Sequence, residues 1–224
     1  MVIGLVLCGL VAVLLFFGVA ERVFKSFGVA GWLAFVFIGV LIGCAFIPSF
    51  GIGAVRFNVA GFFAPLLFAA VFFFFAARTH EAMHALVTAT VIVALFIAVW
   101  LLIDPVTSDV VTVIIAGFLC GAVGYLVGKT NLSALAAVFL GMPIGEVISS
   151  AVGVYAYGST MQFGTAATFD AVILAAVFSV ALNEAVSAIK RAMNNKSHNK
   201  TDMLLNTEAA EEFDKDEYKK YFDE

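Results

Sequence analysis

The stretch RTHEAMHALV, residues 78–87, contains the His-Glu-x-x-His spacing of zinc peptidase helices. On a helix, His80 and His84 are four residues apart and project from one face, where two imidazoles can bind zinc. Glu81 could then polarise a zinc-bound water. Zinc also needs a third protein ligand, which must come from elsewhere in the chain.

Glu184 is the candidate third zinc ligand. NEAVS, residues 183–187, resembles the Asn-Glu-x-x-Ser segment of thermolysin-like peptidases. Short loops of a membrane protein gather its polar residues, however, so chance matches arise there. The Asp-Gly segment that accompanies this motif in site-two proteases is not seen. A polar turn at headgroup level is therefore favoured, with a membrane zinc metallopeptidase as the alternative.

Two carboxylates lie inside otherwise apolar runs near the same predicted end. Glu146 lies in GMPIGEVISS and Asp170 in TAATFDAVIL, on consecutive runs. An ionised carboxylate in a bilayer is costly and therefore usually faces protein or water and has a task. Arg56 and Asn58 begin an earlier run at the same end. Two interpretations stay open: a structural salt bridge from Arg56 to one acid, or a site for a cation, a proton or a polar solute.

The elements that must position these residues are transmembrane helices. The chain is 63% hydrophobic and 12% charged, and only helices or closed barrels satisfy their backbone in lipid. The alternation of a barrel is absent. We predict an all-α, polytopic bundle of about seven helices, at Val2–Ala20, Gly28–Pro48, Phe57–Ala77, Ala85–Ile103, Val110–Gly128, Leu132–Val152 and Thr168–Ile189. Gly141, Pro143 and Gly145 are expected to loosen the sixth helix.

The distribution of basic residues predicts the orientation. With the N-terminus outside, eight Lys or Arg residues fall in cytoplasmic segments and Arg56 alone lies outside. The C-terminus is then cytoplasmic. We therefore expect a multi-pass protein of the cytoplasmic (cell) membrane, and the two buried acids lie in its outer half.

A change of composition divides the chain into a transmembrane domain, residues 1–189, and a charged tail, residues 190–224. The start of the tail is basic and suits anionic membrane lipids. The acidic part, residues 201–224, is expected to be solvated, and it could bind a protein partner. A scaffold acting through this tail is a further alternative function. Nucleic-acid binding is not expected at a net charge of −4.

The second half resembles a family of bacterial and archaeal membrane proteins defined as domain of unknown function number one-six-one-four. LGMPIGEVIS matches its Gly-Ala-Asp block, with Glu146 in place of the Asp, and FGTAATFDAVILA matches its Gly-Thr-Phe-Asp block, with Asp170 as the acid. The segments GCAFIPSF and RFNVAGFFAPLL are similar to its earlier Pro- and Gly-containing segments. The resemblance implies that the two acids pair across the outer ends of late helices.

Together these features predict transport of a small solute, an ion or protons rather than an enzyme. Its site would comprise Glu146, Asp170, Arg56 and Asn58, and no cofactor would be needed. In the metallopeptidase alternative, His80, His84 and Glu184 would hold zinc beside Glu81.

Overall fold

A computed structural model of the chain describes residues 2–18, 31–53, 55–103, 109–157 and 161–193. The described helices are α1 (Val2–Phe16), α3 (Gly31–Ala45), α4 (Ala64–Arg78), α5 (Ala82–Leu102), α6 (Asp109–Gly128), α7 (Asn131–Tyr157) and a last helix, Ala166–Met193. A short π-helix, η1 (Val59–Phe63), leads directly into α4. Each of the seven predicted apolar runs thus contains a described helix, and the predicted fold class is confirmed.

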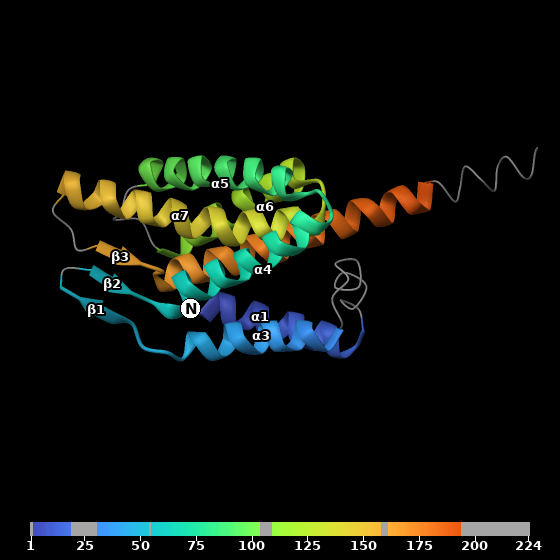
Figure 1. Cartoon of the computed structure of the whole chain (residues 1–224), viewed down its shortest axis with the longest axis horizontal. Coiled ribbons are helices and arrows are strands. Elements are labelled where there is room, and N and C mark those ends of the chain that lie inside the picture. The colour runs from blue at the N-terminus through green and yellow to red at the C-terminus, as the bar shows by residue number, and fades with distance from the viewer. Residues whose placement is uncertain (1, 19–30, 54, 104–108, 158–160, 194–224) are drawn as a thin grey trace, which may run out of the picture. The chain divides into compact units, whose positions relative to one another are not determined.

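Five described helices are long and apolar enough to cross a membrane, with η1 and α4 counted as one helix, Val59–Arg78. The described residues of α1 and α3 form shorter helices of 15 residues each. At 1.5 Å per residue they reach about 22 Å, less than the roughly 30 Å of a hydrocarbon core. α1 ends at a turn in which Gly18 has φ 74°. Figure 1 shows the two short helices side by side, and they contact each other.

A small sheet caps one end of the helices and was not predicted. Its strands are β1 (Phe50–Ile52), β2 (Val55–Phe57) and β3 (Met161–Phe163), in that order. β1 and β2 are antiparallel, whereas β2 and β3 are parallel, with Arg56 opposite Gln162. Three residues are too few for the alternation that identifies a strand in a sequence. We call this end of the bundle, visible in Figure 1, the strand end.

The helix α7 packs against α4, α5 and α6. Its first nine residues, 131–139, are all buried. The expected loosening of this helix is wrong, because α7 continues through Pro143. Its glycines instead allow close packing: a Cβ on Gly141 would lie 2.9 Å from the Ala89 carbonyl oxygen, and one on Gly145 would lie 3.0 Å from the Phe96 ring.

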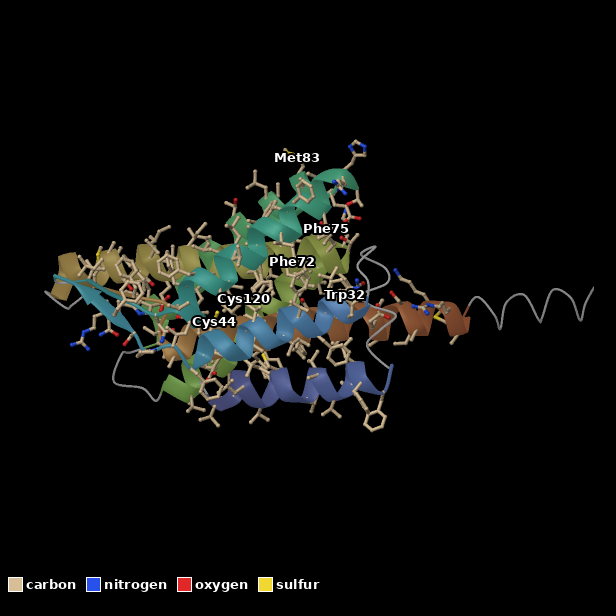
Figure 2. The ribbon with its side chains drawn as sticks, turned by 60° about the horizontal axis from the view of Figure 1, so that its bottom comes forward. Trp32, Cys44, Phe72, Phe75, Met83 and Cys120 are labelled. Atoms are coloured by element: carbon tan, nitrogen blue, oxygen red, sulfur yellow. The ribbon has the colours of Figure 1, made fainter. Side chains whose placement is uncertain are left out.

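Apolar side chains cover much of the outside of the helices, as expected for contact with lipid. Trp32 and Met83 are 66% and 70% exposed, whereas Phe72 and Cys120 are buried, and Figure 2 labels all four. The cysteines are free thiols. Large exposed hydrophobic residues on this scale suit a bilayer rather than water.

Candidate functional site

Two strand-to-helix units lie in parallel at the strand end. In the first, β2 leads through Asn58 into η1 and α4; in the second, β3 leads through Gly164 into the last helix. The backbone N–H of Asn58 donates to the Phe163 carbonyl at 2.9 Å. The units touch where Gly61 meets Gly164. Gly164 has φ 74°, and a Cβ there would lie 2.5 Å from the Phe62 nitrogen, so a side chain is excluded for two reasons.

The first unit is capped by its own side chain. The Asn58 Oδ1 accepts hydrogen bonds from the backbone N–H groups of Ala60 at 2.9 Å and Gly61 at 3.4 Å. Such a residue satisfies N–H groups that have no partner inside the first helical turn. Asn58, predicted as a binding residue, therefore has a capping role here.

The second unit is capped by a carboxylate from another helix. Glu146 on α7 is 5% exposed. Its Oε2 accepts from the Gly164 N–H at 2.6 Å, and its Oε1 accepts from the Thr165 N–H at 2.9 Å and the Thr168 hydroxyl at 2.5 Å. These donors precede and begin the last helix, where the helix dipole also favours negative charge. These three hydrogen bonds partly offset the cost of burying the Glu146 carboxylate.

A cavity of about 450 Å³ lies beside Glu146. α5, α6, α7, β3 and the start of the last helix all contribute to its wall. Among the lining residues, Gln162 and Ala166 are exposed, whereas Val113 and Ala171 are buried. The cavity thus runs inward from the strand end. Its described lining comprises Phe96, Trp100, Ile103, Thr112, Val113, Ala116, Glu146, Ser149, Ser150, Gln162, Thr165, Ala166, Ala167, Thr168 and Ala171.

The four predicted site residues do not gather in this cavity. Only Glu146 lines it. Asp170 is also buried, but its Oδ1 accepts from the Gly4 N–H of α1 at 2.8 Å. Arg56 is exposed on β2, and the described residues show no ion pair from it to either acid. The interpretation of Arg56 as a salt-bridge partner therefore has no support in the described contacts.

Comparison with known proteins places the chain in a membrane-protein family. The family model described as YphA-like integral membrane protein matches residues 31–203. The chain belongs to this family. No curated protein and no solved structure matches. The match supports a multi-pass integral membrane protein, but the family that matches is not the one suggested by the two acid-bearing blocks.

In this YphA-like protein the His-Glu-x-x-His stretch does not lie on one helix. α4 ends at Arg78 and α5 begins at Ala82, so His80 precedes the helix and has φ 61°. The Glu81 carboxylate accepts from the Thr130 hydroxyl at 2.6 Å. The single helical face that the zinc alternative requires is therefore not formed, and residues 79–81 form a turn between α4 and α5, as the favoured interpretation predicts.

The candidate third zinc ligand, Glu184, belongs to a second compact unit that begins at this residue. Within that unit the Arg191 guanidinium lies 3.7 Å from the Glu184 carboxylate. Among the described residues, no group of three or more His, Cys, Asp or Glu side chains could hold a metal. The acidic tail at 201–224, for which a protein partner was expected, lies outside the described residues.

Sequence reasoning missed the residues that complete the site around Glu146. Gly164 and Thr165 supply backbone N–H groups, and such donors leave no signal in residue type. Trp100 and Phe96 line the cavity from α5, but in the sequence they are two more aromatic residues in an apolar run. The one available signal is the uncharged, Gly- and Thr-rich link before the last helix, because the backbone of such a link can line a cavity within a membrane protein.

Proposed function

We propose that this YphA-like protein moves a small solute or ion across the cell membrane through the cavity beside Glu146. The observation that carries the proposal is a buried carboxylate on the wall of a cavity that runs inward from the strand end. About 450 Å³ lies within the usual range for small-molecule sites, roughly 300–1,000 Å³. Buried ionisable groups inside membrane proteins commonly mark solute or ion paths.

The start of the last helix supports this role. Discontinuous helices in transporters present backbone groups to a site within the membrane, and here β3, Gly164 and Thr165 precede the helix beside the cavity. Arg78 is the last residue of α4 and Lys129 follows α6, so the charge rule favours that end as cytoplasmic. The strand end, and with it the cavity mouth, would then face outward.

Flux measurements on purified protein in liposomes test the proposal. We expect uptake of small cationic, neutral or anionic solutes, or of protons followed with a pH-sensitive dye, above that of empty liposomes. Ala167→Leu places a larger side chain on the cavity wall and should reduce that flux about tenfold or more, because the solute and the side chain compete for one volume.

The matched control is Ala94→Leu. Ala94 is exposed on α5 and does not line the cavity, so the same substitution there should leave flux unchanged. Flux no faster than through empty liposomes for every solute, or equal flux in Ala167→Leu and wild type, would contradict the proposal.

A further inference from the structure

Two serine hydroxyls on the cavity wall donate their hydrogens to backbone carbonyl groups. Ser149 Oγ donates to the Glu146 carbonyl oxygen at 3.1 Å. Ser150 Oγ donates to the Gln162 carbonyl oxygen at 2.9 Å. A hydroxyl has one hydrogen and two lone pairs, and a carbonyl oxygen can only accept. What these serines can offer an occupant is therefore a lone pair.

Two threonine hydroxyls on the same wall also use their hydrogens in hydrogen bonds within the protein. Thr168 Oγ1 donates its hydrogen to the Glu146 carboxylate. Thr165 Oγ1 and Thr168 Oγ1 are 3.0 Å apart. Since the hydrogen of Thr168 is already used, Thr165 must donate in this second contact. Neither threonine has a hydroxyl hydrogen left for a bound molecule.

The cavity wall is thus rich in hydrogen-bond acceptors. Four of its hydroxyls accept but cannot donate, and Glu146 is the one charged residue among the described lining residues. Phe96 and Trp100 add two aromatic rings, whose faces attract cations. Beyond those four hydroxyls, the side-chain donors among the described lining residues belong to Trp100, Thr112 and Gln162. An anion would meet these donors beside a carboxylate, whereas an N–H-bearing cation would meet the acceptors and two aromatic rings.

We infer that the cavity selects a small organic cation that carries N–H groups, namely a protonated amine. The inference rests on the proposed function, because it names the class of solute that this site would take. An ammonium group can donate up to three hydrogen bonds, which suits several acceptors around one volume. The apolar part of such a solute would lie against Phe96, Trp100 and Ile103.

Trp100 provides a direct reporter of occupancy. The chain has two tryptophans, and Trp32 is on α3 and does not line the cavity. In the Trp32→Phe protein, bound solute should shield Trp100 from acrylamide quenching. Propylammonium chloride, 1-propanol and sodium propionate are matched cationic, neutral and anionic probes, compared at constant ionic strength.

We expect propylammonium to protect Trp100 at a concentration about tenfold or more below that of propanol. Propionate should be the weakest. Glu146→Gln removes the charge with little change in size and should abolish the preference for the cation. The matched control is Asp170→Asn, which neutralises a second buried acid that is not on the cavity wall and should keep the preference.

Equal protection by propanol and propylammonium, or stronger protection by propionate, would overturn the inference while leaving a solute cavity in place. Unchanged cation preference in a folded Glu146→Gln protein would overturn it as well. If Glu146→Gln does not fold, the comparison of the three probes on the Trp32→Phe protein decides alone. Absence of both protection and flux would instead remove the proposed function together with the inference.

Discussion

The two parallel strand-to-helix units differ in where the cap of the helix comes from. In the first unit, Asn58 bonds N–H groups two and three residues further along the chain. In the second, Glu146 bonds N–H groups 18 and 19 residues further along. The first cap is neutral and local, whereas the second is charged and belongs to another helix.

This difference explains why only the second unit carries a candidate site. A local cap satisfies its helix and brings no extra charge to that end of the bundle. A cap from α7 ties two helices together and places a carboxylate on the cavity wall. In the second unit, a change at Glu146 is therefore expected to affect both stability and function. In the first unit, a change at Asn58 is expected to affect stability alone.

Substitution at the contact between the two strand-to-helix units should cause the largest loss of stability. Gly164→Ala requires φ 74° from a residue with a Cβ and places that Cβ 2.5 Å from the Phe62 nitrogen and 2.7 Å from the Asn58 carbonyl oxygen. We expect a loss of about 4 kcal/mol or more, and hence little folded protein. The yield in detergent and reaction of a thiol-reactive dye with the buried Cys8 and Cys120 measure this.

Gly9→Ala is the control for this substitution. Gly9 lies inside α1 with nothing within 4 Å of an added Cβ, so alanine should leave stability unchanged or raise it by about 1 kcal/mol. Normal yield and stability of Gly164→Ala would show that the close approach of the two units is incorrect.

The next largest effect should separate the two caps. Glu146→Ala leaves two backbone N–H groups and one hydroxyl without their acceptor, and we expect a loss of about 3 kcal/mol. Asn58→Ala removes a local cap and should cost about 1 kcal/mol. Thermal unfolding of both variants in one detergent gives the comparison. Equal losses would contradict the distinction between a remote and a local cap.

The fold class could be predicted from the sequence because lipid imposes a simple rule. Runs of about 20 apolar residues are expected to be helical in lipid, and each predicted run contains a helix among the described residues. The pairing of β2 with β3 could not be predicted, since it joins segments about 100 residues apart, such as Arg56 opposite Gln162. The strands themselves are too short to show an alternating pattern.

The candidate site could be predicted only in part, for a related reason. The buried position of Glu146 and Asp170 was visible as charge within apolar runs. Their hydrogen-bond partners were not visible, because both carboxylates accept from backbone N–H groups: Asp170 from Gly4 of α1, and Glu146 from Gly164. Two acids on neighbouring helices can face opposite sides of the bundle. The sequence spacing between two separate helices does not determine which side each acid faces.

Labelling of a single cysteine tests the central claim most directly. In a protein with Cys8, Cys44 and Cys120 replaced by Ala, Ala167→Cys places one thiol on the cavity wall. A membrane-impermeant maleimide should label this thiol from the outer face of intact cells, and propylammonium should slow the labelling. Labelling only from the cytoplasmic face, or none before the protein is unfolded, would contradict an outward-opening cavity that reaches Glu146.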